Sequence, residues 1–93
     1  MATTSLDGEA SLLKFPAAIS IKAMGLNEPD FEALVLELVQ PHIAPATPSK
    51  VVTTLSSKEK YMSVRVHFTA LNQAQIERIY VALRAEPRVK FTL

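Results

Sequence analysis

With 93 residues, the chain is long enough for one domain with a single core and too short for two. Its 48% hydrophobic residues argue against disorder, and its net charge of +1 gives no bulk attraction to nucleic acid or to a membrane. The absence of cysteine excludes disulfides and thiolate zinc sites, and no apolar run reaches the roughly 18–20 residues of a membrane span. The sequence therefore predicts a cytoplasmic protein.

The amino-terminal part divides into a tail and a first strand. Residues 1–11 contain few large apolar side chains, so a mobile tail is predicted there and a single domain over residues 12–93. A strand is predicted over residues 17–24, where apolar and polar side chains alternate. It ends at Gly25, which indicates a turn with a positive φ angle or a close backbone approach.

A helix is predicted next, capped by Asn27 and limited by Pro41. Its buried stripe consists of apolar residues at helical spacing, namely Phe31, Leu34, Val35, Leu38 and Val39. The prolines that follow predict an irregular connection over residues 41–49.

Two strands joined by a hairpin follow this connection. Alternation over residues 51–56 predicts the second strand, and residues 57–60 turn the chain into the third, residues 61–71. In this third strand the core phase holds Met62, Val64, Val66 and Phe68, and the outer phase holds Tyr61, Ser63, Arg65, His67 and Thr69. Both strands are therefore expected to bury one face only.

The last two elements are a second helix and a final strand. Asn72 caps the helix, with Gln75 three positions later, and Pro87 closes it. Its buried stripe is Ile76, Ile79, Tyr80 and Leu83. The final strand is predicted over residues 88–93, with Val89, Phe91 and Leu93 toward the core.

The element order β-α-β-β-α-β predicts an α+β, ferredoxin-like fold. Right-handed crossovers place the last strand beside the first and the third between the first and second. We therefore expect a four-stranded antiparallel sheet of order 4-1-3-2 with two helices on one face.

Several short motifs resemble the YbeD family of small bacterial proteins over about residues 13–93. They are Leu13-Lys14-Phe15-Pro16, Met24-Gly25, the hairpin and strand start at residues 58–64, Ile79-Tyr80, and the end at residues 89–93. The resemblance implies a ferredoxin-like fold similar to the ACT domain, a regulatory module that often binds amino acids between copies. It also implies a glycine at the hairpin, where this chain has Glu59. Members have no established biochemical activity.

The predicted open face of the sheet gathers positive charge. Lys22 lies on the first strand, Arg65 and His67 on the third, and Arg88 and Lys90 on the fourth, with no carboxylate in the same phase. One interpretation is a solvated face whose edge lysine discourages aggregation. The other is a surface that binds a small anion or an acidic protein partner.

The favoured hypothesis is a non-enzymatic regulatory or interaction module, acting as a homodimer or on a partner protein. Weak single-stranded RNA binding is the second, although the outer phase offers only Tyr61 for stacking. Metabolite sensing at the Gly25 turn is the third. No catalytic motif occurs, His42 and His67 lie on different elements, and neither a cofactor nor a metal is expected.

Overall fold

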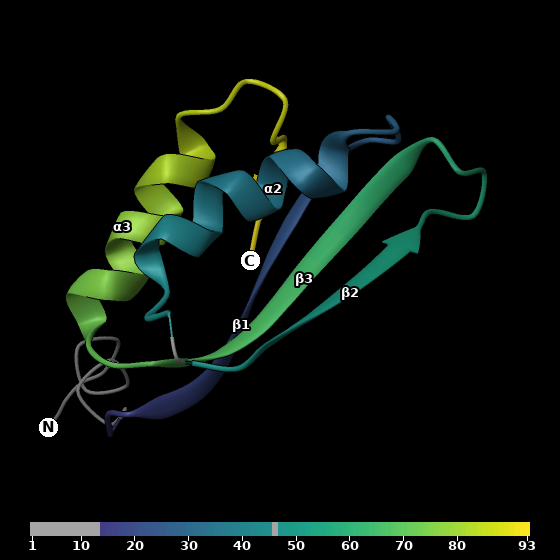
Figure 1. Ribbon diagram of the computed structural model, residues 1–93. Helices are drawn as coiled ribbons and strands as arrows, with labels where there is room; N and C mark the ends of the chain where they lie inside the picture. Colours follow the sequence, from purple (N-terminus) through teal and green to yellow (C-terminus); the bar gives the residue numbers. More distant parts are fainter. Residues whose placement is uncertain (1–13, 46) are drawn as a thin grey trace, which may run out of the picture.

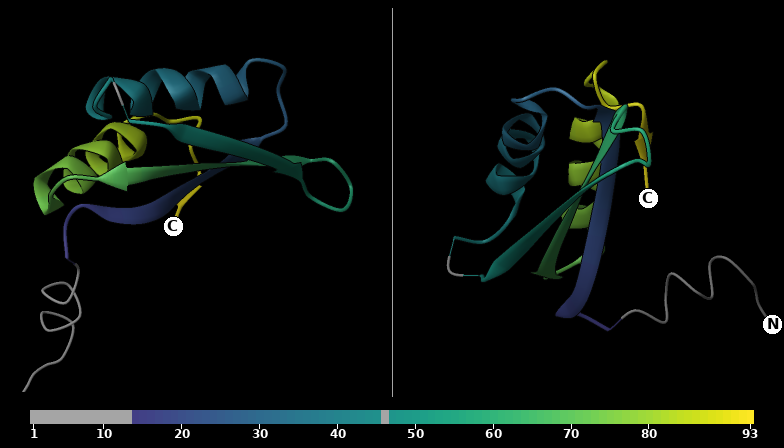
Figure 2. Two further views of the ribbon diagram at one scale, coloured as in Figure 1. Left: turned by 60° about the horizontal axis from the view of Figure 1, so that its bottom comes forward. Right: turned by 90° about the vertical axis from the view of Figure 1, so that its right-hand side faces the viewer.

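The computed structural model describes residues 14–45 and 47–93, so the tail predicted for residues 1–11 lies outside the described residues. Strands β1 (Ala17–Leu26), β2 (Ser49–Leu55), β3 (Tyr61–Ala70) and β4 (Phe91–Thr92) form one antiparallel sheet of order β2-β3-β1-β4. Helices α2 (Phe31–Val39) and α3 (Gln73–Arg84) lie on one face, and the 3-10 helix η1 (Gln40–His42) follows α2 (Figure 1; Figure 2). The ferredoxin-like fold and its strand order are confirmed.

The core lies between the helices and one face of the sheet. Its fully buried side chains come from the predicted phases and stripes: Ile21, Val64 and Val66 of the strands, with Phe31, Val35, Val39, Ile79 and Leu83 of the helices. Tyr80 packs against this core as a half-buried residue. Neither α2 nor α3 covers the opposite face of the sheet, which we call the open face.

Helix α2 begins later than predicted. Its N-cap is Asp30, without a side-chain capping hydrogen bond, whereas Asn27 donates from Nδ2 to the carbonyl of Glu59 at 2.9 Å. The predicted cap at Asn27 was wrong because β1 continues to Leu26, which pairs with Tyr61. Asn27 therefore follows the strand directly, and its side chain links the segment between β1 and α2 to the β2–β3 hairpin.

The final strand is shorter and irregular. The amide of Lys90 donates to the carbonyl of Met24 at 2.8 Å and that of Leu93 to Lys22 at 2.9 Å, so three residue steps on β4 cover two on β1. One residue is extra, as in a β-bulge, and the side-chain phase changes there. Val89 packs against the core as predicted, but Phe91 pairs with Met24 on the open face.

The expectation that Phe91 and Leu93 point inward was therefore wrong. Phe91 is 65% exposed and Leu93 is 72% exposed. Simple alternation counts residues along one strand, so it cannot detect an extra residue that only pairing with β1 reveals.

The hairpin between β2 and β3 holds Glu59 at φ 57°, a left-handed conformation that costs side-chain-bearing residues about 1 kcal/mol. Glu59→Gly is expected to raise the free energy of unfolding by about 0.5–1 kcal/mol, because glycine adopts this conformation without steric cost. Urea unfolding measures the change. The matched control is Lys58→Gly, where φ is not positive and a small loss of stability is expected; equal effects at both positions would contradict the prediction.

Candidate binding face on the open side of the sheet

Strand register arranges the open face in rows of side chains. Lys50, His67 and Ser20 form one row across β2, β3 and β1; Val52, Arg65 and Lys22 form the next; Thr54, Ser63 and Met24 form a third. Paired residues of neighbouring strands point to the same side, so these side chains share one surface. We call Lys22, Lys50, Arg65 and His67 the cationic patch.

The centre of the cationic patch is fixed by the sheet itself. Arg65 is half-buried and donates from Nη1 to the hydroxyl of Ser20 at 3.2 Å across the β1–β3 boundary. Lys22 lies directly opposite Arg65. Like charges in this position repel each other, and no Asp or Glu occupies the open-face phase of β1, β2 or β3. A bound anion would offset that repulsion.

Lys50 belongs to this patch although it was not among the predicted site residues. It pairs with His67 in the β2–β3 ladder and is exposed. Its signal was present in the sequence, because alternation over β2 places Lys50 in the same phase as Val52 and Thr54. The predicted strand began at residue 51, whereas β2 begins at Ser49, so Lys50 lay outside the predicted strand.

Arg88 does not join the patch. Its Nη2 lies 2.8 Å from Oε1 of Glu28 and 2.7 Å from Oδ1 of Asp30, both just before α2. The hydrogen bond from Arg88 holds the pKa of Asp30 below its usual value, and the two carboxylates raise the pKa of Arg88. Its predicted place among unpaired cations was wrong, since the turn before β4 points it toward the start of α2.

Lys90 and Gly25 also lie away from the rows of the cationic patch. Lys90 is exposed at the bulge, before the paired residues of β4. Gly25 is buried within β1 and its φ is not positive, so the turn geometry predicted there is wrong. The close approach is confirmed: an added Cβ would lie 2.4 Å from the Arg88 carbonyl oxygen and 2.5 Å from Cε1 of Phe31. The Arg88 carbonyl and the Phe31 ring therefore occupy the space where a side chain at Gly25 would lie.

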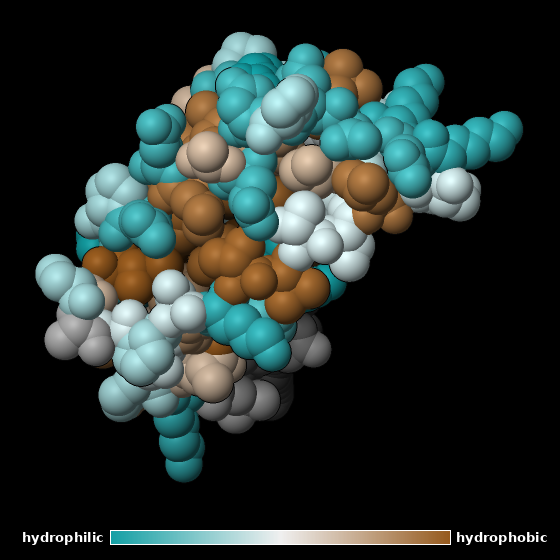
Figure 3. Space-filling model, turned by 45° about the vertical axis from the view of Figure 1, so that its right-hand side comes forward, coloured by the Kyte–Doolittle hydropathy of each residue, from teal (hydrophilic) through white to brown (hydrophobic). Residues whose placement is uncertain are grey.

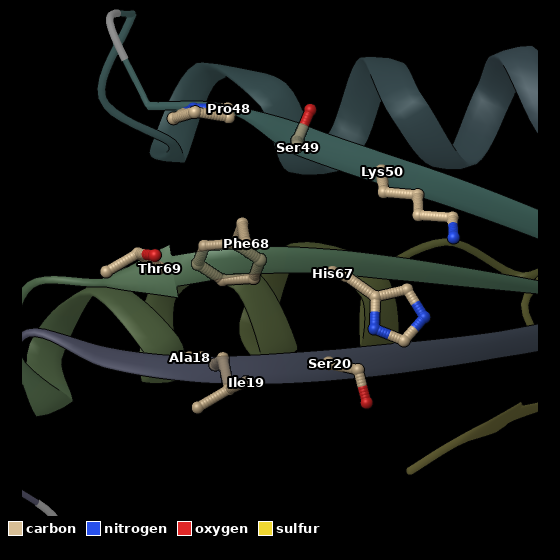
Figure 4. Close-up of a pocket in the computed structure, with 9 residues that line it drawn as sticks. All are labelled: Ala18, Ile19, Ser20, Pro48, Ser49, Lys50, His67, Phe68 and Thr69. Atoms are coloured by element: carbon tan, nitrogen blue, oxygen red, sulfur yellow. The ribbon is translucent and has the colours of Figure 1, made fainter.

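A shallow hollow of about 450 Å³ adjoins the cationic patch. Its walls include Lys50 and His67 of the cationic patch, together with Ser20, Phe68 and Thr69, and Figure 4 shows Lys50 and His67 toward one end of the hollow. The hollow opens toward solvent between residues of β1, β2 and β3. It offers one nitrogen-rich end and one mostly apolar end.

Two negative findings apply to the part of the chain that the structure describes. No group of three or more His, Asp or Glu side chains in residues 14–45 and 47–93 is placed to hold a metal ion. No helix in the same ranges has the length and hydropathy to cross a bilayer. His42 lies in η1 and His67 in β3, on separate elements as the sequence indicated.

Comparisons with known proteins give a consistent result. The family described as "Protein of unknown function (DUF493)" matches residues 10–93. The chain is 41% identical over 91 residues to a UPF0250 protein of Neisseria gonorrhoeae, covering 97% of this chain and 99% of the other. A UPF0250 protein of Paraburkholderia phymatum is 34% identical over 83 residues, 89% of this chain and 93% of the other.

The fold also has a solved counterpart. The solution structure of protein HP0495 from H. pylori is similar with a TM-score of 0.72, covering 100% of this chain and 98% of that one. The two sequences are 17% identical, so this likeness supports the fold alone.

Proposed function

The chain belongs to the DUF493 family of proteins of unknown function (UPF0250, YbeD type), and from that premise we propose a non-enzymatic binding module that docks an acidic protein segment or a small anion. The supporting observation is the direct pairing of Lys22 with Arg65, with Lys50 in the adjacent row and no carboxylate in these phases. An anionic partner bound to such a surface would be attracted by several cations at once and would reduce the repulsion between them.

The spacing of the patch suits an extended acidic segment. Neighbouring strands lie about 5 Å apart and same-face residues along one strand about 7 Å apart, which is close to the spacing of carboxylates along an extended chain. Lys22 and Arg65 would take one carboxylate and Lys50 the next. Since the patch is exposed to solvent, the affinity is expected to fall as salt increases.

Reversing the charge of the patch tests this proposal. Lys22→Glu with Arg65→Glu is expected to reduce binding of poly-glutamate, and of any protein captured from native-cell extract, by at least about tenfold, because attraction becomes repulsion. Fluorescence anisotropy measures the first and quantitative affinity capture the second.

The matched control is Lys58→Glu with Arg78→Glu, which makes the same change in net charge on exposed residues of the hairpin and α3. Both variants are expected to melt close to the wild type, since all four side chains lie outside the core. Equal loss of binding in both variants would show a net-charge effect and refute a role for the patch.

Weak single-stranded RNA binding is the second candidate, favoured by the position of Phe91. The bulge of β4 places this ring on the open face beside Met24, and Tyr61 lies at the end of β3. Base stacking on an aromatic ring contributes about 1–3 kcal/mol. Phe91→Ala is therefore expected to weaken a low-salt gel shift of an RNA oligonucleotide at least about fivefold, with Val81→Ala on α3 as control. An unchanged shift would remove this candidate.

A further inference from the structure

The two edges of the sheet are built differently. The β4 edge contains two paired residues and a bulge, features that prevent pairing with another chain. The β2 edge is seven residues long and pairs with β3 in unbroken register. It contains no proline, and Lys50 is its only charge. A long, regular and almost uncharged edge is a template for another strand, and within residues 14–45 and 47–93 no strand pairs with the outer side of β2.

Apolar side chains flank this edge on the helix side. Leu55 is 44% exposed and Val51 is half-buried at the border of the core. The Thr53 hydroxyl donates to the carboxylate of Glu32, which shows that this side of α2 faces β2, and Leu36 follows one helical turn later on the same side. Figure 3, in which the right-hand side of Figure 1 comes forward, shows hydrophobic side chains gathered near the middle of the molecule.

The backbone fixes which groups of the edge are free. The amide of Ser56 donates to the carbonyl of Tyr61 at 2.9 Å, which makes these two residues a hydrogen-bonded pair. In an antiparallel ladder such pairs alternate, so Lys50, Val52 and Thr54 direct their backbone groups toward β3. The outward amides and carbonyls are those of Ser49, Val51, Thr53 and Leu55.

We propose that a second copy of this chain pairs with β2 in an antiparallel, two-fold symmetric arrangement centred on Val52. Full overlap of Ser49–Leu55 with itself places Val51 opposite Thr53 of the second copy and Ser49 opposite Leu55. All four outward residues then form hydrogen-bonded pairs, and the two Val52 side chains meet at the axis. The dimer has one continuous sheet, twice the four strands of the single chain.

A second copy fits better than an unrelated strand because the edge is self-complementary. In this register Lys50 lies opposite Thr54 of the second copy, so no like charges face each other. The exposed side chain of Leu55 would be covered from both sides of the axis. The symmetric pairing also covers the β2 edges of both copies, so the continuous sheet of the dimer ends on each side at a short, bulged β4 strand.

Charge substitutions at the axis test this proposal with the full chain. Val52 is 37% exposed on the open face, so Val52→Lys and Val52→Glu are expected to fold, as checked by circular dichroism. Each alone places like charges opposite each other and is expected to raise the dimer dissociation constant at least about tenfold. Mixed in equal amounts, the two variants are expected to recover association, because Lys then faces Glu.

Sedimentation equilibrium gives the result directly. The expected outcome is about twice the 10.2 kDa chain mass for the wild type, a lower mass for each variant, and recovery in the mixture. Val81→Lys on α3 is the control and is expected to remain dimeric. A monomeric wild type, a dimer unaffected by either variant, or a mixture without recovery would each overturn the pairing. The double variant Lys22→Glu with Arg65→Glu, whose changes lie on β1 and β3 and not on the β2 edge, is expected to remain dimeric, which separates this test from that of the cationic patch.

Discussion

Gln75→Ala is expected to lower the free energy of unfolding by about 2–4 kcal/mol. Gln75 is only 4% exposed, and its side chain accepts from the Leu71 amide at 2.6 Å and donates to the His42 carbonyl at 2.7 Å. It thereby joins the start of α3 to η1. Alanine would leave both backbone groups without these partners, at a cost of about 1–3 kcal/mol for each buried group that stays unsatisfied.

Chemical denaturation monitored by circular dichroism measures this loss. Gln73→Ala is the matched control, because Gln73 lies on the same turn of α3 but is exposed. Its effect is expected to stay within about 0.5 kcal/mol. If Gln75→Ala were as stable as Gln73→Ala, the hydrogen bonds of Gln75 would not contribute to holding η1 against α3.

Gly25→Ala is expected to lower the free energy of unfolding by about 2–3 kcal/mol. The new Cβ would lie 2.4 Å from the backbone oxygen of Arg88 and 2.5 Å from Cε1 of Phe31, which is fully buried. Real Cβ atoms do not approach this closely, so the connection before β4 and the ring of Phe31 must both shift. Overpacking a filled site costs about 1–3 kcal/mol, and a rigid backbone neighbour places this site at the upper end.

The control is Ala18→Ser at an exposed position on the open side of the same strand, where an effect within about 0.5 kcal/mol is expected. Thermal unfolding of the two variants separates a clash inside the core from a general weakness of β1. Equal melting temperatures for Gly25→Ala and wild type would mean that the contact at Arg88 is not held in solution. The same variant is expected to retain poly-glutamate binding below its melting temperature, because Gly25 is not part of the cationic patch.

The sequence alone determined the elements whose signals are local and repeated. Alternation over β3 placed Val64 and Val66 in the core, and helical spacing did the same for Ile79 and Leu83. The cap of α3 was equally local: Asn72 Oδ1 accepts from the Gln75 amide at 2.8 Å. Period-two and period-3.6 patterns report burial directly, since one side of each element must face the core. The strand order followed from the handedness of the connections.

Only the tertiary structure decided how separate elements meet. The bulge that turns Phe91 outward arises from the pairing of β4 with β1. The ion pairs of Arg88 reach Glu28 and Asp30, which precede it in the sequence by 60 and 58 positions. Asn27 bonds to the hairpin instead of capping α2 because β1 runs two residues further than its pattern indicates. Each of these outcomes depends on a partner distant in sequence, so no local pattern carries it. The cationic patch illustrates both local and long-range control. Its members on β1, β2 and β3 follow from the alternation of side chains along each strand, whereas Arg88 is excluded from it by its ion pairs with residues near α2.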